Sequence, residues 1–563
     1  MARAQADSSA YAHAESDEED AEATANAWAT AEATGLFLRG AYPDSIFSNA
    51  GLISGHALAT AYARADADGE DDYYTSTEAS AYAYAIGLNV SDGSYFDTLT
   101  NELDGVIEAH ATAEGGASEN EESSDGHARA YAIGLHGDVL TFVTLLNDGT
   151  INATASAQEY AYARGIELSN VNDASYSGEI VNTGTISASA TSDNPYATAI
   201  LLDGNAYVHS IRNTGTISAT VFDYDEDTYD GEDGHAIAID IRGAAQGVTI
   251  EQLDGSIVGD VRMENALSDY LDWSGGTISG DIYGDQEDDH LNIFAGEDAS
   301  FVYHGTVDGL DRFSINGGDY DDDILVRLTN TVRNVNMFNV GPNATLNLGK
   351  FAEITTGDLN LDASSMLVFD LTSDGVNGVI NTVTADLGGA TVKANFIDPW
   401  LPDSQVYRII NWEGDSETRF GSVISSSLLE KVVAQYGEEG VDLLATRLKF
   451  ADLTGLEDDA TSFGLALDRI FDDIDPDSEL GQAIMLLIQL TPDQFAYEMS
   501  QIAGQQIADV QHVTLSQLGS LIHVIQTQIN EARTNLTNNA GADGVKVSFG
   551  SDKLRVTSGD DMP

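Results

Sequence analysis

The chain has 563 residues, of which 42% are hydrophobic, so it is long and apolar enough to bury a sizeable core. Its charge is one-sided, because 93 Asp and Glu against 23 Lys and Arg give a formal net charge of -70. This charge excludes general nucleic-acid binding and docking on anionic lipid through a basic patch, since both depend on basic side chains. The absence of cysteine excludes disulfides, thiolate zinc sites and a cysteine nucleophile.

A short motif recurs through the first half of the chain, Asn-x-Gly-x-Ile followed by alternating small residues. The clear copies begin at Asn49, Asn147, Asn182 and Asn213. Weaker copies have their glycine at Gly105, Gly255 and Gly276. We expect the motif to form a corner of the chain, because Asn and Gly both tolerate positive φ at little cost.

A second motif lies between these copies and consists of alternating alanines before an aliphatic pair, as in residues 81–88. Alternation with a period of two indicates strands, and self-similarity every 20–50 residues is typical of a solenoid, propeller or array. Each unit is too small to bury its own apolar face, so stacked coils must share one interior. The two motifs together therefore predict an all-β fold, a parallel β-solenoid.

The alternation also predicts which side chains face outward. We expect alanines to point inward before a bend near Ala85, and Ile86 and Leu88 to point inward after it. The outer face then carries a candidate ligand-binding surface, in which a first column is flanked by a second. The first column comprises Tyr82, Arg129, Tyr162 and Tyr196, and the second comprises Tyr84, Tyr131 and Arg164. Tyr and Arg are frequent anchors of interfaces, although a stack that merely stabilises the sheet is an equally good interpretation.

Four acidic insertions separate the two motifs and are expected to form loops along one edge of the solenoid. They span residues 15–22, 66–78, 114–125 and 223–233. Solvated loops are the plain interpretation, and Ca²⁺ binding is the alternative, because carboxylates are its preferred ligands. A separate stretch, which partly matches the calcium-binding Gly-Gly-x-Gly-x-Asp repeat, contains the candidate metal ligands Asp319, Asp321, Asp322 and Asp323. No other cofactor is expected.

The pattern changes along the chain and predicts three regions. Residues 1–345 form the repeat solenoid, residues 346–450 form a β-solenoid cap with irregular strands, and residues 451–563 form a helical linker. Within the linker, apolar residues at helical spacing predict a helix over about residues 505–533. The opposite face of this helix is rich in glutamine, which suits a polar environment.

Three blocks of sequence together resemble a classical monomeric autotransporter, of the type V secretion family. These blocks are the Asn-Thr-Gly-Thr-Ile-Ser-Ala repeat, the segments 407–411 and 441–447, and the segments 460–470 and 490–509. The resemblance implies a right-handed parallel β-helix passenger on the outer surface of a Gram-negative outer membrane. The chain lacks an apolar signal segment and a translocator barrel, so we expect a fragment or a processed passenger, held at the membrane only through a barrel outside this chain.

The resemblance favours a structural surface protein over an enzyme. We expect an adhesin or a self-association factor in aggregation and biofilm formation, with a host or neighbouring-cell surface, including its glycans, or a second copy as partner. The alternative is a polysaccharide lyase or hydrolase, or a phage or secreted carbohydrate-binding β-helix. Carboxylate pairs cannot decide this, because acids are in excess. No serine-protease or His-Glu-x-x-His motif is present.

Overall fold

The computed structural model describes residues 2–16, 21–40, 45–69, 73–91, 93–119, 122–125, 127–170, 178–222, 235–294, 299–317, 323–397, 403–414, 416, 418–453, 456, 458–475, 478–488, 490–504, 525–527, 546–550 and 553–557. The chain divides into two compact units. Unit 1 comprises Met1–Leu346, Glu353–Ser365 and Asn381–Leu387, and unit 2 comprises Asn347–Ala352, Met366–Ile380 and Gly388–Pro563. The division predicted at residues 345 and 450 stays a prediction.

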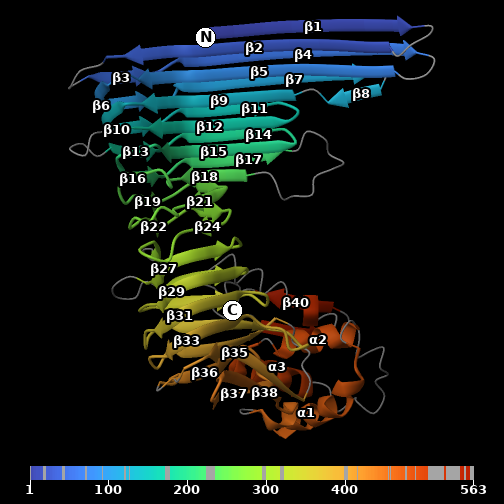
Figure 1. Ribbon diagram of the computed structural model, residues 1–563. Helices are drawn as coiled ribbons and strands as arrows, with labels where there is room; N and C mark the ends of the chain where they lie inside the picture. The colour runs from blue at the N-terminus through green and yellow to red at the C-terminus, as the bar shows by residue number, and fades with distance from the viewer. Residues whose placement is uncertain are drawn as a thin grey trace. The chain divides into compact units, whose positions relative to one another are not determined.

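Unit 1 is a right-handed parallel β-helix, as predicted, and up to β25 each coil contributes one strand to each of three columns (Figure 1). Column A contains β1 (Ala2–Ser16), β4 (Leu52–Gly69), β7 (Val106–Glu119), β11 (Thr150–Ser156), β14 (Thr185–Thr191), β17 (Thr216–Phe222), β20 (Ser256–Val258) and β23 (Thr277–Ser279). The short β8 (Glu122–Asp125) pairs with β7 in the antiparallel sense.

The other two columns have the same parallel arrangement. Column B contains β2 (Ala21–Arg39), β5 (Tyr73–Ser91), β9 (His127–Asp138), β12 (Tyr160–Ser169), β15 (Asn194–Asp203), β18 (His235–Asp240), β21 (Asp260–Arg262) and β24 (Ile282–Tyr283). Column C contains β3 (Ile46–Asn49), β6 (Ser94–Asn101), β10 (Leu140–Asn147), β13 (Gly178–Asn182), β16 (Val208–Asn213), β19 (Thr249–Gln252), β22 (Tyr270–Trp273) and β25 (His290–Phe294). Later strands are β26 (Ser300–Tyr303), β27 (Val307–Asn316), β28 (Ile324–Leu328), β29 (Thr331–Val340), β30 (Ala344–Leu348), β31 (Glu353–Leu361) and β33 (Val379–Asp386).

Alanine fills the interior of the first coils, on the faces predicted to point inward. Ala83 of β5 and Ala109 of β7 are fully buried, and they belong to one cluster of buried alanines from columns A and B. Ile86 and Leu88, after the predicted bend, are buried as well. Farther along the chain larger side chains such as Trp273 replace alanine. The part of the first coils between the alanine segments of columns A and B is therefore thin, whereas larger side chains such as Leu99 fill the interior at column C.

The motif glycines lie one above another at the corner between columns C and A, as predicted, but for a different reason. Gly149, Gly184 and Gly215 do not have positive φ, whereas Gly255 and Gly276 do. A Cβ at Gly184 would lie 2.1 Å from the carbonyl oxygen of Gly149, and a Cβ at Gly215 would lie 2.1 Å from that of Gly184. The expectation from φ is thus wrong for these coils, where close approach of successive backbones requires glycine.

The motif asparagines form an internal hydrogen-bonded row, which we call the asparagine ladder. Its members are Asn49, Asn101, Asn147, Asn182 and Asn213, followed by Gln252. Each asparagine donates from Nδ2 to the side-chain oxygen of the next member, at 2.8 Å between asparagines and 2.7 Å to the glutamine. The members are buried, so these bonds satisfy polar groups that water cannot reach.

The acidic insertions differ from the predicted loops. Residues 66–69 continue β4 and residues 73–78 begin β5, so much of the second insertion is strand. The first insertion likewise falls partly in β1 and β2, and the third in β7 and β8, while residues 223–233 lie outside the described residues. In β4 the reason is that Ala65 and Ala67 alternate with Asp66 and Asp68, and this period of two extends the strand.

Unit 2 contains parallel strands, antiparallel strands and helices. The parallel strands are β32 (Met366–Leu371), β34 (Thr391–Phe396) and β36 (Ser422–Ser425), and the antiparallel strands are β35 (Ser404–Trp412), β38 (Gly440–Arg447) and β37 (Glu430–Gly437). Next come η1 (Phe450–Asp452), α1 (Asp458–Ile470), η2 (Phe471–Asp473), α2 (Glu479–Ile488), α3 (Pro492–Gly504) and the hairpin of β39 (Lys546–Gly550) with β40 (Lys553–Thr557). Phe450, Phe471 and Phe495 anchor the helical core. Of the helix predicted over residues 505–533, only residues 525–527 are described, and they are helical.

Candidate functional site

A row of tyrosines runs along the outer face of column B. Tyr84, Tyr131, Tyr162 and Tyr196 occupy paired positions on β5, β9, β12 and β15. We call these four residues the tyrosine column. Because side chains alternate along a strand and the flanking alanines fill the interior, the tyrosines must stand on the outer face, where all four are half-buried. The outward placement predicted from the sequence is therefore confirmed.

The register within this surface differs from the prediction by two residues. Tyr82 pairs with Arg129, which pairs with Tyr160 rather than with Tyr162. Arg164 pairs with Ile133, two residues along the strands from the tyrosine column and therefore beside it. The physical reason is that alanine alternates with tyrosine on these strands, so a shift by two residues conserves the pattern. Tyr160 was missed for the same reason.

The rings of the tyrosine column stack on one another along the solenoid axis. Ring centroids are 4.8 Å apart for Tyr131 and Tyr162, and 5.0 Å apart for Tyr162 and Tyr196, with interplanar angles of 8° in both pairs. The Tyr84 and Tyr131 centroids are 6.4 Å apart. Since successive rings cover each other's faces, the middle of the column presents ring edges and hydroxyl groups outward. A sugar ring cannot stack on these faces without separating two tyrosines.

Three hydroxyl groups of this surface have a raised pKa. Burial raises the pKa of Tyr84 to about 12, with a further contribution from the nearby Glu167 carboxylate. Burial, with the neighbouring tyrosines, also raises the pKa of Tyr82 and Tyr162. These three hydroxyl groups can therefore act as neutral hydrogen-bond donors and acceptors.

Ionic groups flank the tyrosine column on both sides. On one side, Arg129 lies over the Tyr160 ring with its Cζ 5.2 Å from the centroid. On the other side, Arg164 Nη1 donates to Glu167 Oε1 at 2.6 Å, and His136 Nδ1 lies 3.8 Å from Glu167 Oε2. Glu167 and His136 could not be assigned to this surface from the sequence, because they follow the bend that brings them beside Arg164. The result is an aromatic surface with charged borders.

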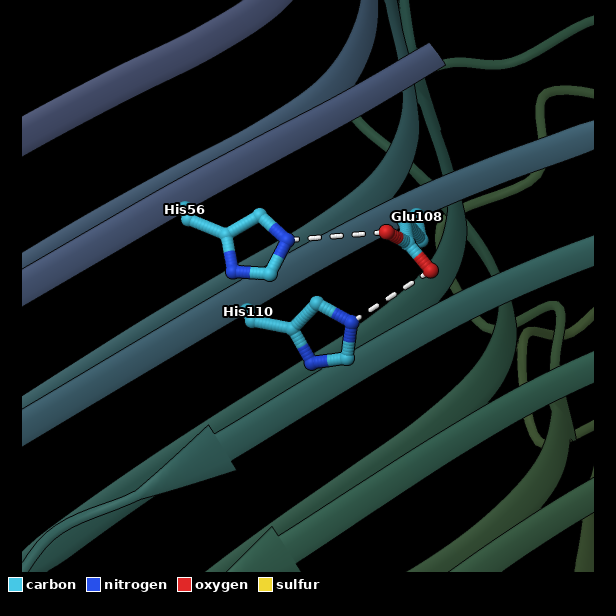
Figure 2. Close-up of side chains that lie close together, drawn as sticks. All are labelled: His56, Glu108 and His110. Atoms are coloured by element: carbon cyan, nitrogen blue, oxygen red, sulfur yellow. Dashed lines mark ion pairs between the residues drawn. The ribbon is translucent and has the colours of Figure 1, made fainter. Parts of the chain in front are cut away.

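A second cluster lies on the outer face of column A. His56 of β4 pairs with His110 of β7, and Glu108 precedes His110 by one step of the alternation. His56 Nε2 and His110 Nε2 each lie 3.5 Å from a different oxygen of the Glu108 carboxylate (Figure 2). The imidazole rings are 4.6 Å apart between centroids. The sequence analysis did not predict this cluster, because His56 and His110 are brought together only by the pairing of β4 with β7.

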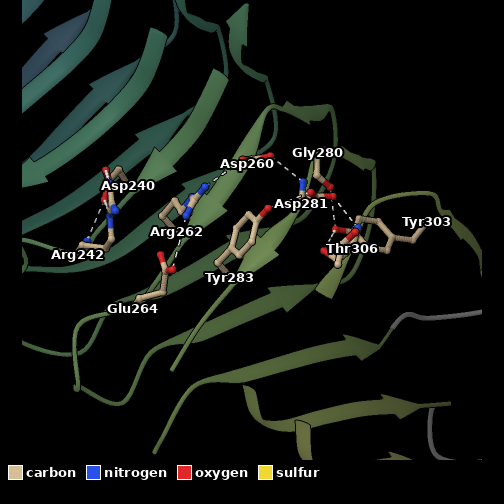
Figure 3. Close-up of polar contacts among 10 residues, drawn as sticks. All are labelled: Asp240, Arg242, Asp260, Arg262, Glu264, Gly280, Asp281, Tyr283, Tyr303 and Thr306. Atoms are coloured by element: carbon tan, nitrogen blue, oxygen red, sulfur yellow. Dashed lines mark hydrogen bonds and ion pairs between the residues drawn. The ribbon is translucent and has the colours of Figure 1, made fainter. Parts of the chain in front are cut away.

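A third polar cluster connects the later coils (Figure 3). The backbone N–H of Asp281 donates to Asp260 Oδ1 at 2.9 Å, and the backbone N–H of Thr306 donates to Asp281 Oδ1 at 2.6 Å. Arg262 lies over the Tyr283 ring, with its Cζ 3.9 Å from the centroid. These aspartates satisfy backbone donors of the next coil, so the cluster joins coils to one another and we assign it a structural role.

Of the four metal ligands predicted from the sequence, the structure describes one. Asp319, Asp321 and Asp322 lie outside the described residues, and Asp323 is an exposed residue just before β28. Ca²⁺ binding there and along the acidic insertions stays a prediction.

Comparison with known protein families, curated proteins and solved structures finds no match to this chain. Within the described ranges, helices of the length and hydrophobicity needed to span a membrane do not occur.

Proposed function

We propose that this chain is the passenger region of an exported bacterial surface protein, displayed on the outer face of a Gram-negative bacterium, and that it acts as an adhesin. The resemblance to autotransporter passengers and the parallel β-helix of unit 1 support this proposal. A solenoid of stacked coils offers long lateral surfaces on which the same chemical group recurs at every coil. Such surfaces suit contact with large, repetitive partners better than capture of a small molecule.

The single observation that carries the proposal is the tyrosine column with Arg129 and Tyr160 beside it. It places neutral hydroxyl groups in a row, one per coil, on a half-buried aromatic surface. A polysaccharide chain also presents neutral hydroxyl groups at regular intervals, and edge-on hydrogen bonding to it leaves the tyrosine stack intact. The partner proposed is therefore a glycan of a host or neighbouring-cell surface.

Self-association is the second contact that this surface could make. The formal charge of -70 opposes the approach of two copies in dilute buffer, because like charges repel over about 10 Å at 0.1 M salt. A neutral glycan meets no such repulsion. The charge balance therefore favours a foreign glycan surface over a second copy as the first partner.

The test displays the chain on a non-adherent bacterium and measures adherence to glycan-coated surfaces and clumping. Tyr131→Phe with Tyr162→Phe removes two hydroxyl groups but keeps the stack, and Tyr62→Phe on column A is the matched control, since Tyr62 is 47% exposed. We expect the double variant to lower adherence several-fold with an unchanged melting temperature, and the control to adhere like the wild type. Unchanged adherence of the double variant would assign the tyrosine column a purely structural role. No adherence or clumping of the displayed wild-type chain would refute the proposed function.

A further inference from the structure

The cluster of His56, Glu108 and His110 has the chemistry and the spacing of a metal site. Its ligand atoms, one per residue, all lie within 4.8 Å of one another. Two ligands bound to a tetrahedral ion at 2.0–2.1 Å are about 3.3 Å apart. The two nitrogen–oxygen separations of 3.5 Å are close to this value, so an ion could be accommodated by small rotations of the side chains.

The two strands hold the three side chains rigidly on one face. Ala57 after His56, and Ala109 and Ala111 on either side of His110, are buried, which directs the three polar side chains outward. The side chains of His56, His110 and Glu108 are 34%, 33% and 23% exposed, so an ion can approach the cluster from water, and a small rotation of the His56 ring uncovers its buried Nε2. The pairing of β4 with β7 therefore builds the site before any ion arrives, and binding costs little reorganisation.

One ligand atom of the cluster lacks a hydrogen-bond partner. His56 Nε2 is covered from water and makes no hydrogen bond, although it lies 3.5 Å from Glu108 Oε1. A bound cation would satisfy this buried nitrogen, because its lone pair is the group that ligates a metal.

The ligand types decide which ions fit. Neutral imidazole nitrogens with one carboxylate suit Zn²⁺ and its first-row neighbours, whereas Ca²⁺ and Mg²⁺ require oxygen ligands. We propose that His56, Glu108 and His110 bind one divalent transition-metal ion of the Zn²⁺ class, with water completing its coordination. The ion would join two coils of the solenoid, because His56 belongs to β4 and the other two ligands to β7. This site differs from the predicted Ca²⁺ sites in ligand, ion and place, and it does not depend on the proposed adhesin function.

The test is calorimetric titration of the full chain, freed of any histidine tag, with Zn²⁺ and separately with Ca²⁺ at equal ionic strength. We expect a saturable Zn²⁺ site that is weakened at least tenfold in each of His56→Gln, His110→Gln and Glu108→Gln. His209→Gln is the matched control, because this exposed histidine of β16 lies outside the cluster, and it should bind Zn²⁺ like the wild type. Circular dichroism of each variant verifies that the solenoid is retained.

Two further measurements test whether the metal binds at these three residues. Co²⁺ should give the intense visible d–d bands of a four-coordinate site, and these should be lost in His56→Gln and His110→Gln, since the aqua ion gives only weak bands. Zn²⁺ should also raise the melting temperature of the wild type in a saturable manner. Absence of saturable Zn²⁺ binding would overturn the proposal, and so would binding that survives all three substitutions.

Discussion

Gly184→Ala tests why the solenoid has glycine at its corner. The new Cβ would lie 2.1 Å from the carbonyl oxygen of Gly149 and 2.7 Å from the carbonyl carbon of Asp148. Ordinary carbon contacts need about 3.5 Å, so one backbone must move away from the other by about 1 Å. That movement weakens the bond from the Thr185 backbone N–H to the Gly149 oxygen, which is 2.8 Å long. Overpacking costs about 1–3 kcal/mol and a buried unsatisfied group a similar amount, so we expect a loss of about 4 kcal/mol in the free energy of unfolding.

Gly51→Ala is the matched control, at the same position of the motif in an earlier coil. Nothing lies within 4 Å of the position that the new methyl group would occupy, and φ of Gly51 is not positive, so alanine there should be neutral or stabilise by about 0.4–1 kcal/mol. Urea unfolding followed by circular dichroism measures both variants, and hydrogen exchange of β13 and β14 localises the effect. Equal losses in the two variants, or a loss below about 1 kcal/mol for Gly184→Ala, would refute close approach as the reason for glycine.

Two other predictions concern buried polar groups. Asn182→Ala removes two bonds of the asparagine ladder, to Asn147 and Asn213, and should lower the free energy of unfolding by about 1–3 kcal/mol, measured in the same urea assay. Burial raises the pKa of Asp269 and of Asp289 from 3.8 to about 7, so the folded chain keeps protons that the unfolded chain releases. Stability should therefore fall as the pH rises from about 4 to 7, and Asp269→Asn with Asp289→Asn should flatten this part of the profile. An equally steep profile in the double variant would contradict the assignment.

The fold could be predicted from the sequence because its determinants repeat. The alternation of alanine indicated the inward faces, and the spacing of Gly149, Gly184 and Gly215 indicated a line of corners along the axis. The asparagine ladder could not be predicted in the same way, because its bonds join residues of different coils and depend on their register. Asparagine was therefore explained by φ, although its side chain is what the fold uses.

The candidate surface was predicted only in part. Its tyrosines were placed on the outer face correctly, but the columns were misaligned, and Tyr160 and Glu167 were missed. The cluster of His56, Glu108 and His110 was not predicted at all, since His56 is separated along the chain from the other two by a whole coil and the three belong to no known motif. What the sequence lacked in both cases was the lateral alignment of coils.

The folding chain must also select the correct register between neighbouring coils. Ala153 and Ala155 lie beside Ala109 and Ala111, so a strand that slipped by two residues would still place alanine against alanine. The alternating alanines alone hardly distinguish the two arrangements, although the slip would also move Ile151 away from Ile107. The asparagine ladder distinguishes them as well, because a slipped coil would bury an asparagine such as Asn147 away from its partners. The ladder therefore gives the native register an energetic preference that a repeat of alanines lacks.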